Sequence, residues 1–212
     1  MFAYHNDPSI KEAILAQLSS HALADELVKG LYWEDGKGCA VGCTIHSGDH
    51  AEYESRFGIP QMLAHLEDRI FEGLPNNKAK EWPCRFMGAI RPGADLSRVG
   101  WKFLHWLMTD ASVNPGINHP LVKTAVEDCA SLIFKLSVGE PIARSAAESA
   151  GSAAWSAGSA AESAAWSARS AAESAAESAA RSAAESAAWN AAESAAYVLM
   201  SEKLVHLLEA AQ

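Results

Sequence analysis

The spacing of apolar residues over roughly the first 140 positions predicts a series of helices separated by turns. The first helix is expected to begin at Asp7-Pro8, where the aspartate can cap the helix and the proline fits its first turn. Apolar residues then recur at helical spacing as far as Gly30, which is a stop signal. These apolar residues are Ile10, Ile14, Leu18, Leu23 and Leu27.

The same periodicity predicts further helices in this region, and turn residues mark their ends. Gly58-Ile59-Pro60 opens one of them, and Pro75-Asn76 closes it. No segment alternates apolar and polar residues as a half-buried strand does, so we expect no sheet. The helices are expected at residues 39–46, at 58–75, around Trp82, at 96–110 and from Asn118 to about residue 136.

From residue 145 to residue 197 the chain is a Ser-Ala-Ala-X repeat with 25 alanines and 13 serines in 53 residues. The X positions step by about 3.6 residues from Arg144 to Arg169, and by four residues from there to Tyr197. A step of four drifts around a straight helix by about 40° per repeat, so we expect two or three packed helices. The large residues available to fill gaps between alanine-rich faces are Trp155, Trp166 and Trp189.

Disorder is the alternative for a repeat of such low complexity, although alanine has the highest helix propensity of all residues. The tail that follows, residues 198–211, has leucines at helical spacing and is expected to dock as an amphipathic helix. The sequence therefore predicts an all-α, multi-helix bundle. We expect a helical globular region over residues 1–140, which carries the segment Gly36–His50, and a repeat region over residues 141–212 packed on it.

The composition excludes several classes of function. The chain has 26 acidic and 17 basic residues and a net charge of −9, which argues against binding to a nucleic acid backbone. No stretch of about 18 apolar residues suggests a membrane span, and the N-terminal residues do not read as a secretory signal. Four cysteines are too few for a disulfide scaffold, so we expect reduced thiols and a cytoplasmic protein.

The segment Gly36–His50 concentrates chemically active residues, because it holds two of the four cysteines and two of the eight histidines. One hypothesis is a nucleophilic thiolate at Cys39. The start of a helix and the neighbouring Lys37 would lower the pKa of the Cys39 thiol. The catalytic base would then be a histidine brought near by the fold. The candidates for this base are His46, His105 and His119.

A second hypothesis is a metal site, with zinc as the possible ion. Cys39, Cys43, His46 and His50 would share one face of a continuous helix, where neighbouring pairs can chelate an ion. All four span about 16 Å along such a helix, so they reach one ion only if the helix breaks near Ser47–Asp49.

A third hypothesis is a small-ligand or anion site around the glycines of this segment. Its binding residues would be Lys37, Gly38, Tyr32, Trp33 and His5. The alternative to all three hypotheses is structural: the glycines form a tight turn and the two cysteines are small buried apolar residues. Glu67 and Asp68 are expected on a solvated helix face.

Residues 4–107 resemble a group of bacterial proteins of unassigned function. The motifs that carry this resemblance are Tyr4-His5-Asn6-Asp7, the Tyr32–Cys43 segment of the form YWxxGKGCAVGC, Leu74-Pro75-Asn76 and Gly93-Ala94-Asp95-Leu96. The alanine-rich stretch 144–197 is similar to helical regions of bacterial immunity proteins, which implies a binding function. Neither resemblance implies a catalytic residue.

Two functions remain open from the sequence. The first is a soluble binding protein for a small ligand or a protein partner, of the immunity kind. The second is a hydrolase or transferase that depends on a cysteine or a metal and is centred on Cys39 and His46. Alanine-faced helices could also bury themselves against a second copy of the chain in a homo-oligomer.

Overall fold

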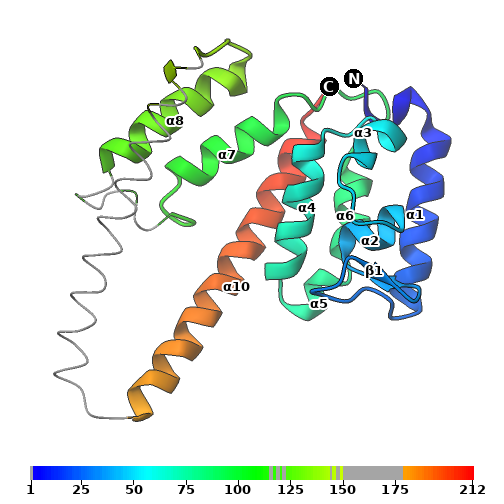
Figure 1. Cartoon of the computed structure of the whole chain (residues 1–212), viewed down its shortest axis with the longest axis horizontal. Helices are drawn as coiled ribbons and strands as arrows, with labels where there is room; N and C mark the ends of the chain where they lie inside the picture. Colours follow the sequence, from blue (N-terminus) through cyan, green and yellow to red (C-terminus); the bar gives the residue numbers. More distant parts are fainter. Residues whose placement is uncertain are drawn as a thin grey trace. The chain divides into compact units, whose positions relative to one another are not determined.

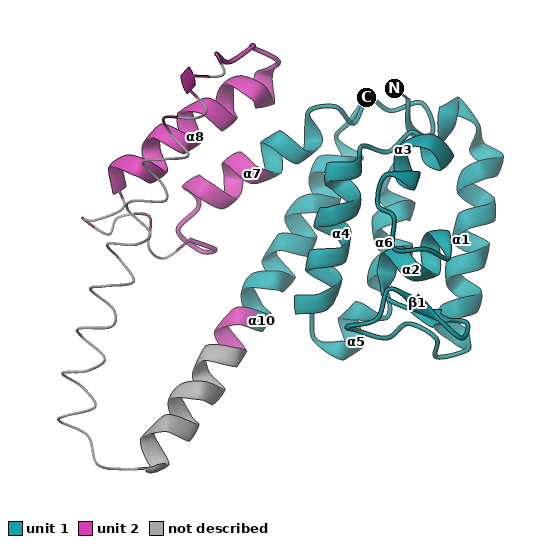
Figure 2. Cartoon of the chain, viewed as in Figure 1, with its two compact units in different colours: residues 1–103, 194–212 teal, residues 104–193 magenta. Residues whose placement is uncertain are grey.

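The computed structural model describes residues 2–114, 117, 120, 123–143, 145, 146, 149 and 179–212, and describes residues 179–190 by their backbone alone. These residues are predominantly helical, which confirms the predicted all-α fold class. The chain has two compact units, one of residues 1–103 with 194–212 and one of residues 104–193 (Figure 2). The expected boundary near residue 140 stays a prediction.

Most of the described helices and both described strands lie in the first unit (Figure 1). Two helices, α7 (Val99–Thr109) and α10 (Ala179–Glu209), contribute residues to both units, and α8 (Lys123–Val138) belongs to the second. The elements of the first unit are η1 (Ala3–Asn6), α1 (Pro8–Leu23), β1 (Trp33–Glu34), β2 (Lys37–Gly38), α2 (Ala40–Ile45), α3 (Glu52–Phe57), α4 (Gln61–Gly73), α5 (Asn76–Ala79) and α6 (Trp82–Ala89).

Helix α1 begins as predicted but ends earlier than the apolar pattern indicates. The Asp7 side chain accepts a hydrogen bond from the backbone N–H of Ser9, at 2.9 Å, and caps the helix. At the other end Asp25 adopts a left-handed conformation with φ of 58°, which stops the helix after Leu23. Leu23 is 89% exposed, whereas Leu27 lies beyond the helix and is buried.

The prediction that the chain contains no sheet is wrong, because β1 and β2 form a small antiparallel hairpin. Asp35 and Gly36 connect the strands, with φ of 49° and 81°. A two-residue turn with both φ angles positive matches the twist of paired strands, and Asp-Gly is a preferred sequence for it. This dipeptide was the signal for the hairpin, and the strands are too short to show alternation.

Helix α2 occupies the centre of the first unit, and all six of its residues are buried. It contacts α1, α4 and α6 (Figure 1). The Tyr32 carbonyl crosses α2 so closely that a Cβ atom at Gly42 would lie 1.4 Å from its oxygen. The same carbonyl oxygen would lie 2.1 Å from a Cβ at Gly38. Glycine at these positions therefore lets the Tyr32-Trp33 segment pack on α2.

The C-terminal part of α10 packs in the first unit, which confirms the predicted docking of the tail. Leu204 and Leu208 are fully buried, and the Tyr197 ring covers the position where Gly73 has no side chain. The described part of the repeat, from residue 179, continues into this tail as one helix. The predicted breaks before residue 179 lie outside the described residues, as do Trp155 and Trp166, and no side-chain position is described for Trp189.

The second unit contains the end of α7 together with α8. The ring of His105 on α7 lies 5.4 Å from the ring of Phe134 on α8. Within the described part of the chain, no helix has the length and hydrophobicity that crossing a membrane requires.

Candidate metal centre

One face of α4 carries three polar side chains. Along the helix, His65 is followed by Asp68 after three residues and by Glu72 after seven. This spacing places the three side chains on the same helix face. Glu67 points elsewhere and is fully buried, where its carboxylate accepts a hydrogen bond of 2.6 Å from the Tyr53 hydroxyl. The expectation that Glu67 and Asp68 lie on a solvated face is therefore wrong.

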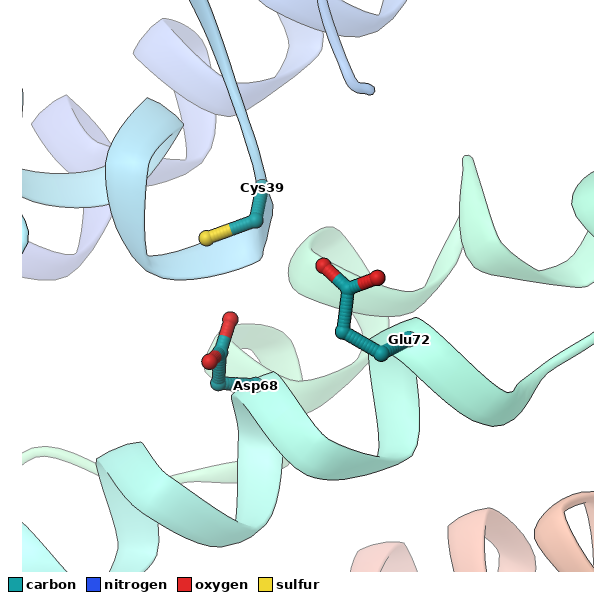
Figure 3. A group of neighbouring side chains, drawn as sticks. All are labelled: Cys39, Asp68 and Glu72. Atoms are coloured by element: carbon teal, nitrogen blue, oxygen red, sulfur yellow. The ribbon is translucent and has the colours of Figure 1, made fainter. Parts of the chain in front are cut away.

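The thiol of Cys39 converges with the carboxylates of Asp68 and Glu72 (Figure 3). The sulfur and one oxygen from each carboxylate lie within 4.8 Å of one another. Cys39 is the N-cap residue of α2, and its side chain faces α4 across the contact between these helices. The backbone N–H of Gly30 donates to both oxygens of Glu72, at 3.0 and 3.1 Å, and so fixes this carboxylate.

His50 lies beside this group with one ring nitrogen available. Its Nδ1 is 3.1 Å from the carbonyl oxygen of Gly48. A carbonyl only accepts hydrogen bonds, so Nδ1 carries a hydrogen, and in the neutral form of the ring Nε2 has a lone pair. Nε2 is 3.6 Å from Oδ2 of Asp68, and the His50 side chain is only 7% exposed. Among the described residues neither His50 Nε2 nor Asp68 Oδ1 has a hydrogen-bond partner.

The ion pairs of the described residues include no lysine or arginine bound to Asp68 or Glu72. Burial raises the pKa of the Cys39 thiol, and the adjacent Asp68 carboxylate raises it further. The sequence argument expected a lowered pKa from the helix start and Lys37. Burial of Cys39, which is 1% exposed, outweighs both effects.

The four metal ligands proposed from the sequence do not meet. Helix α2 ends at Ile45, and the Cys43 thiol donates to the carbonyl oxygens of Gly38 and Glu26, at 3.4 and 3.7 Å. Burial raises the pKa of Cys43 to about 12. Of the four, Cys39 and His50 lie at the Asp68 group, whereas Cys43 lies apart as a buried thiol bonded to backbone.

None of the proposed base residues is placed beside Cys39 by a described contact. His46 instead contacts His21, at 3.0 Å between their Nε2 atoms, and stacks on Trp33. His105 belongs to the second unit, and His119 lies outside the described residues.

The residues proposed to bind a small ligand have other partners or positions. The backbone N–H groups of Gly38 and Cys39 donate to the carbonyls of Glu26 and Leu31, at 3.0 and 2.6 Å, so neither is directed at an anion. Lys37 is exposed on β2.

The two aromatic candidates and His5 are spread over the first unit. The Tyr32 ring lies edge-on to His50 at 5.7 Å, and the Trp33 ring stacks on His46 at 4.3 Å. The remaining candidate, His5, contacts the carbonyl oxygen of Ser55 at 3.1 Å. Of these three residues, Tyr32 lies beside the candidate centre, through its contact with His50.

Sequence reasoning missed Asp68 and Glu72, the two carboxylates of the centre. The signal was present as His65-x2-Asp68-x3-Glu72 on the helix predicted over residues 58–75. Because the apolar stripe of this helix was clear, its other face was assigned to solvent. Helices α2 and α4 meet across that polar face, and no local sequence pattern predicts a contact between two separate helices.

Comparisons with known proteins add no relative: no protein-family model, no curated protein and no solved structure matches the chain. The two resemblances noted in the sequence stay predictions, and the geometry of the site carries the functional argument.

Proposed function

We propose that this protein binds a divalent transition-metal ion, zinc in the first place, through Cys39, Asp68 and Glu72 with His50 as the fourth ligand. The observation that carries the proposal is the convergence of a thiol and two carboxylates within 4.8 Å, beside a buried imidazole nitrogen without a hydrogen-bond partner in the described structure. Sulfur, nitrogen and carboxylate ligands together are typical of zinc sites.

A bound cation accounts for the electrostatics of the cluster. In the neutral form of the His50 ring the lone pair of Nε2 faces the carboxylate of Asp68, and the two atoms repel each other unless a cation, either a proton on Nε2 or a metal ion, lies between them. A metal ion between them turns the repulsion into coordination, and it converts the Cys39 thiol into the thiolate that binds it. Nearby hydrogen bonds to Gly48 and Gly30 hold His50 and Glu72 in place, as orienting contacts do around metal ligands.

Metal binding is favoured over catalysis by a free thiolate. A nucleophilic cysteine needs an accessible thiol and a lowered pKa. Cys39 is 1% exposed and its pKa is raised by burial. Of the functions expected from the sequence, the proposal therefore corresponds to a protein that binds a small ligand, and the ligand is a metal ion.

The proposal is tested by measuring zinc affinity with a competing chromophoric chelator after removal of metal from the purified protein. Wild-type protein is expected to bind one zinc ion per chain at this site, and Cys39→Ala to lose that binding. Cys84→Ala is the matched control, because Cys84 also has a raised pKa from partial burial but contacts Ser19 outside the cluster. Equal zinc affinity in wild-type and Cys39→Ala protein would overturn the proposal.

A further inference from the structure

Two histidines form a second group of metal-ligating atoms, apart from the Cys39 centre. His21 lies in the last turn of α1, and His46 follows α2 in a left-handed conformation with φ of 56°. Their Nε2 atoms are 3.0 Å apart, and their ring planes are nearly perpendicular, at 89°. The proposed function makes no use of this pair.

The hydrogen of His21 is assigned by its contact with Glu26. Nδ1 of His21 lies 2.6 Å from Oε2 of Glu26, and an ionised carboxylate only accepts hydrogen bonds. Nδ1 therefore carries a hydrogen, and in the neutral form of the ring Nε2, which lies 3.0 Å from Nε2 of His46, has a lone pair. A histidine that donates one N–H to a carboxylate and keeps the other nitrogen free has the arrangement of a metal ligand.

The other polar neighbour of His46 is the side-chain amide of Gln17, whose two hydrogens have two nearer acceptors. The amide nitrogen of Gln17 lies 3.3 Å from His46 Nε2. The two hydrogens of this amide are already directed at the carbonyl oxygens of Cys43 and Thr44, at 2.7 and 3.0 Å. The two imidazole nitrogens then share either one hydrogen, in an N–H···N hydrogen bond, or a metal ion.

We propose that His21 and His46 chelate a divalent transition-metal ion of the class that prefers imidazole, such as Ni²⁺ or Cu²⁺. Two nitrogens each about 2.0–2.1 Å from one ion, in adjacent coordination positions, are separated by about 3 Å, which matches the pair. Glu26 orients His21 and offsets part of the added charge. His46 is exposed, so water can complete the coordination.

Trp33 supplies a reporter for this site. Its indole ring stacks on His46, with the ring centres 4.3 Å apart and the planes at 21°, and it lies edge-on to His21 at 5.5 Å. A paramagnetic ion held by the two imidazoles would contact this indole and quench its fluorescence.

The experiment is a fluorescence titration with Ni²⁺ of full-length metal-free protein, with calorimetry to measure binding independently. We expect saturable quenching in the wild-type protein. The Ni²⁺ affinity derived from it should fall by at least about tenfold in His21→Gln and in His46→Ala, because each variant loses one of the two chelating nitrogens. His21→Gln can still donate to Glu26 and so guards against loss of folding. Glu26→Gln is expected to weaken Ni²⁺ by about tenfold, the usual effect of removing an orienting carboxylate.

Two controls separate this site from the Cys39 centre. Ni²⁺ quenching is expected to persist in Cys39→Ser and in His206→Ala, a variant of an exposed histidine on α10. Trp33→Phe is expected to remove most of the quenching while calorimetry still detects Ni²⁺ binding. Ni²⁺ affinities of His21→Gln and His46→Ala within about twofold of wild type, or loss of quenching in Cys39→Ser alone, would overturn the proposal whatever the fate of the zinc site.

Discussion

His50 Nε2 lies 3.6 Å from Oδ2 of Asp68, and the opposite nitrogen, Nδ1, donates a hydrogen bond to the carbonyl of Gly48. In the neutral form of the ring the two facing atoms are both electron-rich, and the His50 side chain is 93% buried, since 7% of it is exposed. Water therefore screens the contact poorly. A cation at this position, either a proton on Nε2 or a metal ion, resolves the repulsion, and in the proposed function the Cys39 thiol and the Glu72 carboxylate complete the coordination of a metal ion.

Zinc binding should strengthen as the pH rises through the neutral range. The raised pKa of Cys39 keeps its thiol protonated there, so each zinc ion that binds must displace a proton. The apparent dissociation constant is expected to fall by about tenfold per pH unit between pH 6 and 8. Calorimetry in two buffers of different ionisation enthalpy measures the released proton directly. A pH-independent dissociation constant would show that Cys39 is not a ligand.

Metal-free protein should become less stable as the pH rises from about 4.5 to about 8, and Glu67 should cause much of the change. Burial raises the pKa of Glu67 from 4.5 to about 8, and the Asp68 charge adds to this. The folded protein therefore holds the proton more tightly than the unfolded chain, which ionises first. The stabilisation that the Glu67 proton provides is complete below pH 4.5, the pKa in the unfolded chain. It is lost once the pH has risen to about 8, the pKa in the folded protein.

Glu67→Gln stays neutral and is expected to remove this part of the pH dependence. Glu12→Gln, at an exposed position of α1, should leave it unchanged. Urea unfolding at pH 5 and pH 8 in the presence of a chelator measures the difference. Parallel pH profiles for wild type and Glu67→Gln would contradict the role of Glu67.

Gly42→Ala in α2 should destabilise the protein by about 2–3 kcal/mol or more, because the new methyl group would overlap the backbone carbonyl of Tyr32. Gly88→Ala is the matched control: it also lies in a helix, α6, and a Cβ there meets nothing within 4 Å. The control is expected to be neutral or more stable by up to about 1 kcal/mol. Chemical unfolding of both variants tests the close approach of Tyr32.

Leu204→Ala should cost about 2–5 kcal/mol in the free energy of unfolding, since Leu204 on α10 is fully buried in the first unit. Leu199→Ala, one and a half turns earlier on the same helix and 43% exposed, should cost less than about 1 kcal/mol. Similar losses for both leucines, measured by urea unfolding, would contradict the docking of the tail.

The sequence predicted most helices of the first unit because their ends are encoded locally. Asp7 and Pro8 mark the start of α1, and the leucine spacing after residue 198 marks the docked face of α10. The apolar pattern does not predict the hairpin, because its strands are only two residues long. Only the Asp35-Gly36 turn signalled it.

The candidate centre was predicted only in part, because its ligands come from separate elements. Cys39 and His50 were recognised from their spacing, whereas Asp68 and Glu72 join them only when α4 packs on α2. The direction of the Cys39 pKa shift was also wrong, since local sequence shows a helix start and a lysine but does not show burial. Tertiary packing decided both outcomes.

Optical titration of metal-free protein with Co²⁺ tests the central claim most directly, because a cobalt–thiolate bond has a charge-transfer band that oxygen and nitrogen ligands do not produce. Wild-type protein and Cys84→Ala are expected to develop this band and to saturate at one ion per chain. Asp68→Asn should require at least about tenfold more Co²⁺, and Cys39→Ser should not develop the band. Absence of a thiolate band in wild-type protein, or its survival in Cys39→Ser, would contradict a metal centre at Cys39.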